Sequence, residues 1–160
     1  MHESVREFIA REAPYLQAPV LEVGSLNVNG TVRDLFPHPS LAWGVDIVAG
    51  PGVDQVIDGT TLPLRDAPDQ EPRWGAVVCC EVFEHVADPV HMADEIVRVV
   101  QPGGRVLVTA RGVGFAYHNP PDRWRFMPGT LAELFDRLGC RSMEWPDPQA
   151  PGWFVRAEKP

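Results

Sequence analysis

The fold is decided by residues 20–30, whose sequence is VLEVGSLNVNG. Apart from Glu22, its first four residues are apolar, a run that predicts a strand buried in a sheet. Gly24 then opens a turn, because a residue without a side chain lets the backbone bend tightly and lets a ligand approach it closely. Residues 31–36 are expected to form a short helix that ends before Pro37. The segment predicts a strand, a turn and a helix, although such a turn is as often a plain connection as a ligand site.

Strands and helices alternate along the rest of the chain. This order predicts an α/β fold, a Rossmann-like three-layer sandwich with a mostly parallel seven-stranded sheet and an antiparallel strand from a C-terminal hairpin. The run Pro102-Gly103-Gly104 is expected to separate a helix from the next strand. The predicted helices span 3–12, 31–36, 88–100 and 130–138, and the predicted strands span 20–23, 41–48, 53–57, 76–80, 105–109, 141–145 and 153–158.

Length and charge restrict the class of protein. The chain has 160 residues, which suits a single domain with one core, and a formal net charge of −8, which disfavours non-specific binding to nucleic acid. No apolar run approaches the roughly 18 residues that suggest a membrane span, and the N-terminus lacks the pattern of a signal peptide. We therefore expect a cytoplasmic protein without membrane contact.

An acidic residue follows the second predicted strand at an informative distance. Asp46 lies 22 positions after Gly24, close to the ~20-residue offset at which a carboxylate binds the ribose hydroxyls in nucleotide-binding sheets. A carboxylate can accept two hydrogen bonds from a vicinal diol. The spacing favours a ribose site at the carboxyl end of the second strand, and the alternative is a solvated residue that only ends the strand.

Five segments in this order carry a resemblance to a known family. Together they resemble the class I S-adenosylmethionine-dependent methyltransferases, in particular the small type 11-like family with a Glu-His pair after the fourth strand. The match covers about residues 20–139, and the ordered set is far more specific than any one segment. The segments are LEVG (21–24), GVD (44–46), DGTTLPL (58–64), VVCCEVFEH (77–85) and IVRVVQPGGR (96–105).

The resemblance implies that S-adenosylmethionine binds along the carboxyl ends of the strands, with S-adenosylhomocysteine as product. It places Asp46 on the ribose and Asp58 on the adenine amino group, and it divides the single domain 1–160 into a lead-in (1–19), a cofactor half (20–110) and a substrate side (111–160). The residues implied to bind the cofactor are Glu22, Gly24, Ser25, Gly30, Asp46, Ile47, Asp58, Gly59, Cys80 and Glu81.

The turn departs from the family pattern at two positions. The family usually carries glycines where this chain has Leu26 and Val28, so the turn is expected to differ in shape. The resemblance also implies that Glu22 orders this turn or contacts the amino-acid end of the cofactor, and that Cys80 and Glu81 lie beneath its methionine. A carboxylate near a cationic ligand is electrostatically favourable.

Methyl transfer from a sulfonium requires alignment more than it requires a catalytic group. If the acceptor must lose a proton, the candidate bases are His118, in the polar and aromatic loop after the fifth strand, and His85, whose alternative role is packing or capping. No metal is required. The residues expected to contact the acceptor are Tyr117, Asp122, Arg123 and Arg125.

The sequence thus predicts methyl transfer to an oxygen or nitrogen of a small-molecule or glycan-like acceptor. The alternative is a non-catalytic relative that binds the cofactor or acts by protein contact. A nicotinamide-dependent dehydrogenase is disfavoured because the chain lacks G-x-G-x-x-G at this turn. The short lead-in leaves the site lightly covered, which suggests a bulky acceptor or a homodimer.

Overall fold

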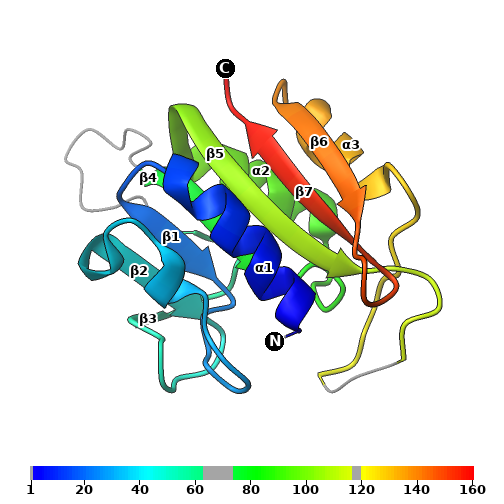
Figure 1. The fold of residues 1–160 in the computed structure, drawn as a ribbon, viewed down its shortest axis with the longest axis horizontal. Coiled ribbons are helices and arrows are strands. Elements are labelled where there is room, and N and C mark those ends of the chain that lie inside the picture. The colour runs from blue at the N-terminus through cyan, green and yellow to red at the C-terminus, as the bar shows by residue number, and fades with distance from the viewer. Residues whose placement is uncertain (1, 63–73, 117–119) are drawn as a thin grey trace.

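The computed structural model describes residues 2–62, 74–116 and 120–160. In these residues the strands are β1 (Val20–Val23), β2 (Ala42–Asp46), β3 (Gln55–Val56), β4 (Trp74–Cys80), β5 (Val100–Arg111), β6 (Arg141–Pro146) and β7 (Gly152–Glu158). They form one sheet in the order β3-β2-β1-β4-β5-β7-β6 (Figure 1). All neighbours are parallel except β7, which runs antiparallel to β5 and to β6. The predicted mostly parallel sheet with an antiparallel C-terminal hairpin is confirmed.

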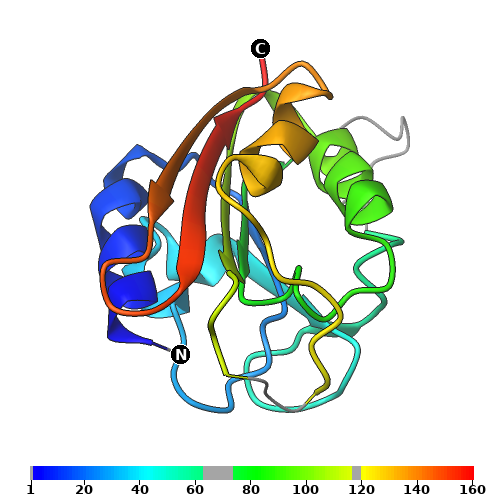
Figure 2. The ribbon, with the colours of Figure 1, turned by 90° about the vertical axis from the view of Figure 1, so that its right-hand side faces the viewer.

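Helices lie on both faces of this sheet. Figure 2 shows α1 (Glu3–Glu12) on one face and both α2 (Pro89–Val99) and α3 (Thr130–Asp136) on the other. Three short 3-10 turns, η1 (Ala13–Tyr15), η2 (Arg33–Leu35) and η3 (Pro39–Leu41), complete the described elements. None of the helices in the described ranges is long and apolar enough to cross a membrane.

Each face of the sheet carries its own apolar layer. On one face α1 buries Val5, Phe8 and Ile9, and the ring of Phe8 stacks on that of Phe154 from β7 with centroids 4.9 Å apart. On the other face α2 and α3 pack over β1, β4 and β5. Because β4 is apolar throughout, it can lie between two helical layers, as expected for a central parallel strand.

The predicted helix at 31–36 is wrong. Only the three-residue turn η2 forms there, and Phe36 already has extended backbone angles of φ −70° and ψ 147°. Proline disfavours helical angles in the residue before it, so Pro37 ends the turn early, and β-branched Thr31 and Val32 favour helix weakly. The connection between β1 and β2 is therefore compact, and its shape depends on side-chain contacts.

Boundaries also differ from the prediction around β2, β3 and β5. β2 and β3 are shorter than expected; β3 is the edge strand, both of its residues are exposed, and it pairs with only two residues of β2. β5 is longer: it begins directly after α2, so the glycine run 102–104 lies within the strand instead of preceding it. Gly103 has φ +75°, and its amide donates to the Lys159 carbonyl at 2.8 Å, so the chain end pairs with this irregular segment.

Leu107 tests the layer beneath α1. Its side chain is fully buried in the middle of β5, so Leu107→Ala is expected to lower the free energy of unfolding by about 2–5 kcal/mol through lost burial and a residual cavity. Urea unfolding measures the change. Leu41→Ala, at a leucine that is 46% exposed, is the matched control and is expected to change stability by less than about 1 kcal/mol.

Candidate cofactor and acceptor site

A cavity of about 790 Å³ opens at the carboxyl ends of β1, β2 and β4. This volume is within the usual range for small-molecule sites, and the position is the one that parallel α/β sheets use for ligands. All ten residues expected to bind the cofactor line this cavity: Glu22, Gly24, Ser25, Gly30, Asp46, Ile47, Asp58, Gly59, Cys80 and Glu81. The structure therefore brings them together, and their individual contacts with a cofactor stay predictions.

The turn after β1 lies against the end of β2. Gly24 has φ +76°, and the amides of Gly24 and Ser25 both donate to the Val45 carbonyl, at 2.9 and 3.1 Å. A Cβ on Gly24 would lie 2.2 Å from the side chain of Val82. Both the backbone angle and the lack of space explain why glycine stands at this position.

Asp46 connects the turn to the strand end. Its Oδ2 accepts a hydrogen bond from the Leu26 amide and its Oδ1 one from the Val48 amide, both at 3.1 Å. Because a carboxylate offers about four acceptor positions, two remain for a ligand diol. Ile47, which is 67% exposed, lies beside it on the cavity wall. The carboxylate thus orders the turn in addition to facing the cavity.

Asp58 lies in a corner that α2 supports. Its Oδ1 accepts from the amide and the hydroxyl of Thr60, at 2.9 and 2.8 Å, and these bonds hold the pKa of Asp58 below its usual value. The Thr60 carbonyl lies 3.1 Å from Nε2 of His91 on α2. Gly59 packs against Met92, whose methyl carbon would be 3.0 Å from a Cβ at that glycine. The acidic corner is ordered by these contacts.

Buried Glu22 and partly buried Cys80 both line the cavity. Burial raises the pKa of Glu22 to about 7, against the opposing effect of Arg33, whose Nε lies 3.5 Å from Glu22 Oε2. Burial likewise raises the pKa of Cys80 to about 12, so this thiol is neutral at physiological pH. A cationic ligand would favour the ionised form of Glu22.

Known proteins match both the sequence and the fold. Residues 33–108 match the family described as methyltransferase domain. This match covers just under half of the chain and supports its assignment to the class I methyltransferases. A curated ubiquinone biosynthesis O-methyltransferase of Xylella fastidiosa is 30% identical over 115 residues, which cover 64% of this chain and 46% of that protein. This chain spans less than half the length of the curated relatives it matches.

Solved structures support the fold independently. A 1,6-didemethyltoxoflavin-N1-methyltransferase of Burkholderia thailandensis, solved with 1,6-didemethyltoxoflavin and S-adenosylhomocysteine, has a TM-score of 0.71 at 18% identity, with 98% of this chain and 78% of that chain covered. A sugar N-methyltransferase of Streptoalloteichus sp. has a TM-score of 0.69 at 14% identity, with 99% and 86% covered. At these identities the similarity establishes a shared methyltransferase fold.

In the loop after β4, His85 pairs with Asp122. Nδ1 of His85 lies 3.1 Å from Oδ1 of Asp122, whose side chain is 2% exposed, and Arg125 pairs with the other carboxylate oxygen. The two loops that carry these residues are joined because the Glu84 carbonyl accepts from the amides of Arg123 and Trp124, at 2.6 and 3.0 Å. His85 lines the cavity, and its side chain is 23% exposed although its Nδ1 is buried.

The other expected acceptor contacts are distributed unevenly. Arg123 is exposed at the cavity wall, and within the described residues its guanidinium makes no ion pair. Arg125 is bound to Asp122, so its charge is already compensated. Tyr117 and His118 lie outside the described residues. Of the two candidate bases, only His85 can be described, and its role stays a prediction.

The sequence groups Arg111 with Arg123 and Arg125 as a candidate cationic site, whereas the structure pairs Arg111 with two carboxylates. It is 3% exposed at the end of β5, and it pairs with Glu81 at the cavity and, at 2.8 Å, with Asp147 from the β6–β7 turn. Glu81 is held in a left-handed conformation, φ +58°, which a non-glycine residue adopts rarely. Phe115 covers the guanidinium at 4.6 Å. The ion pair explains how the Glu81 carboxylate is oriented, and its partners come from distant segments.

Asp46 provides a test of the cofactor side. Asp46→Ala is expected to weaken S-adenosylhomocysteine binding by about 1.5–3 kcal/mol, because charged hydrogen bonds to the ribose are lost and the Leu26 amide loses its acceptor. Isothermal titration calorimetry measures the change. Asp94→Ala, at an exposed carboxylate on α2, is the control and should bind as wild type does. Unchanged affinity in Asp46→Ala would place the ribose elsewhere.

Proposed function

We propose that this methyltransferase domain transfers a methyl group from S-adenosylmethionine to an oxygen or nitrogen of a small-molecule or glycan-like acceptor. The observation that carries the proposal is the convergence of Gly24, Asp46, Asp58 and Glu22 on one cavity. The relative named for O-methyl transfer and the similar folds that act on a sugar nitrogen or a small heterocycle support this acceptor class.

The residues present fit the cofactor. Asp46 retains acceptor positions for a diol, Gly24 leaves bare backbone, and the cavity is large enough for an adenosine joined to an amino acid. When bound, S-adenosylmethionine supplies a methyl group on a sulfonium. The carboxylates of Glu22 and Glu81 place negative charge along the floor of the cavity, where it would attract a cation.

Alignment would provide most of the rate acceleration, because in-line displacement needs the acceptor atom held opposite the leaving sulfur in a dry site. We propose that Arg123 and the loop around it orient the acceptor, and that His85 takes the acceptor's proton at Nε2. Asp122 would hold Nδ1–H and stabilise the imidazolium that forms. The proton thus moves from the acceptor to His85 as the methyl group is transferred. The sulfonium loses its positive charge and the imidazolium gains one.

Calorimetry with S-adenosylmethionine and S-adenosylhomocysteine tests the proposed function. We expect saturable binding of both, and absence of binding at millimolar ligand would contradict the proposal. Transfer of a labelled methyl group to a panel of hydroxylated and amino-bearing small molecules and sugars then tests the acceptor class. Cofactor binding without transfer to any of these acceptors would favour a non-catalytic binding module. Mass photometry would test separately whether a second copy completes the site.

His85 separates chemistry from binding. With an acceptor from this panel, His85→Asn is expected to reduce the turnover rate by about 10²–10⁴-fold, the usual contribution of a general base, while S-adenosylhomocysteine affinity stays unchanged. Asp122→Asn should reduce turnover less, because the imidazole remains but loses its orienting carboxylate. His38→Asn, at an exposed histidine away from the cavity lining, is the control. A full rate in His85→Asn would assign His85 to packing.

A further inference from the structure

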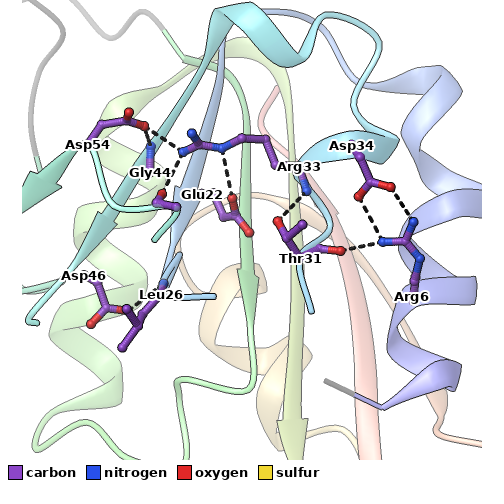
Figure 3. A network of polar contacts seen from close by, with 10 residues as sticks. Arg6, Glu22, Leu26, Thr31, Arg33, Asp34, Gly44, Asp46 and Asp54 are labelled. Carbon is purple, nitrogen blue, oxygen red and sulfur yellow. Dashed lines mark hydrogen bonds and ion pairs between the residues drawn. The ribbon is translucent and has the colours of Figure 1, made fainter. Parts of the chain in front are cut away.

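Arg33 lies beside the cofactor turn and joins three parts of the chain. From η2 its Nη2 donates to the Gly52 carbonyl at 3.0 Å and to Asp54 Oδ2 at 2.7 Å, and its Nε lies 3.5 Å from Glu22 Oε2 (Figure 3). Asp54 Oδ2 also accepts the Gly44 amide at 2.7 Å. One guanidinium therefore connects β1, the β2–β3 loop and, through Asp54, β2.

The backbone around this guanidinium is built to admit it. A Cβ on Gly44 would lie 2.3 Å from Arg33 Nη2, so no other residue at position 44 leaves room for the arginine as it lies. Gly52 has φ +88°, and a Cβ there would lie 2.6 Å from the Ser25 carbonyl oxygen. The β2–β3 loop can approach the cofactor turn only because both positions lack side chains.

The same loop supports the turn directly. The Asn27 amide donates to the Pro51 carbonyl at 2.8 Å, one residue before the carbonyl that Arg33 binds. Leu26 contacts this loop too, since its side chain would lie 2.4 Å from a Cβ on Gly50. Arg33 thus holds the loop on which Leu26 and Asn27 rest, and these are residues of the turn that departs from the family's glycine pattern.

α1 fixes the position of η2. Arg6 binds both oxygens of Asp34, at 2.9 and 2.5 Å, and the Thr31 carbonyl at 2.5 Å (Figure 3). The Arg33 amide donates to Thr31 Oγ1 at 3.1 Å. Contacts with α1 therefore hold the backbone around Arg33, while the guanidinium extends to the β2–β3 loop and Glu22.

We propose that Arg33 is a positioning residue for the cofactor, which orders the turn after β1 and orients the Glu22 carboxylate into the cavity. This inference rests on the proposed function, since it concerns the same cavity. In the usual family turn, small residues let the ligand approach the backbone; here Leu26 and Val28 replace them, and an arginine outside the turn holds its shape.

The charged groups around Glu22 make cofactor affinity depend on pH. The groups that affect it electrostatically are Arg33 and Asp34 from η2, Asp54 before β3 and Cys80 from β4, and of these only Arg33 is cationic. Burial raises the pKa of Glu22 to about 7 in spite of Arg33. The α-ammonium group of a bound cofactor favours the ionised carboxylate, so affinity is expected to rise from about pH 6 to about pH 8.

Calorimetry of S-adenosylhomocysteine binding tests the role of Arg33. Arg33→Ala is expected to weaken binding by about tenfold at about pH 7 and to move the pH rise upward, because Glu22 loses its nearby cation. Arg33→Lys keeps the charge but loses the fork, so it should keep the wild-type pH midpoint with intermediate affinity. Arg105→Ala is the matched control, since that side chain is 24% exposed against 23% for Arg33 and lies away from the cavity lining.

A double-mutant cycle with Glu22→Gln separates positioning from general destabilisation. Glu22→Gln should abolish the pH rise, and Arg33→Ala should then cost much less affinity than it does in wild type, because part of its effect passes through Glu22. Equal losses in both backgrounds, or wild-type affinity in Arg33→Ala and Arg33→Lys, would overturn the inference. Absence of binding in wild type would contradict the proposed function itself.

Discussion

The register of three parallel strands determines where the site forms. Val23 of β1 lies opposite Val45 of β2 and Cys79 of β4. The residues that follow them, Gly24, Asp46 and Cys80, are therefore brought to the same edge of the sheet. A shift of one residue in the β1–β2 pairing would turn the side chains of one strand to the opposite face and would separate the glycine turn from Asp46, which accepts the Leu26 amide.

Partly buried Arg33 and buried Arg111 balance the charge that this convergence creates. The cavity gathers acidic residues from several strand ends, and two of its carboxylates are paired from outside: Glu22 with Arg33, and Glu81 with Arg111. Each arginine binds a second carboxylate as well, so neither pair becomes positive. The arginines orient the carboxylates of Glu22 and Glu81, and the cavity stays net acidic, which suits a cationic ligand.

Local signals predicted the layers and the edge of the sheet at which the cavity opens. Apolar runs located the strands, and the offset from Gly24 to Asp46 placed a carboxylate at the carboxyl end of β2, because both are recurring sequence patterns of parallel α/β sheets. Arg33 and Arg111 have no such signal, since their partners lie up to tens of residues away and meet only in the folded chain. The predicted helix at 31–36 was wrong for a related reason: its residues are held by contacts with α1 and the β2–β3 loop, and helical propensity contributes little.

α1 and the residue before it contact groups that support both arginine clusters beside the cavity. At one point it holds η2 through Arg6 and so supports Arg33 beside the cofactor turn. At its start, His2 contacts the ring of Phe115 edge-on at 5.5 Å, and that ring covers the Arg111 guanidinium. One helix therefore touches both arginine clusters, one at each side of the cavity. Because α1 is packed on the sheet through one apolar layer, a displacement at either cluster must be accommodated by the same packing.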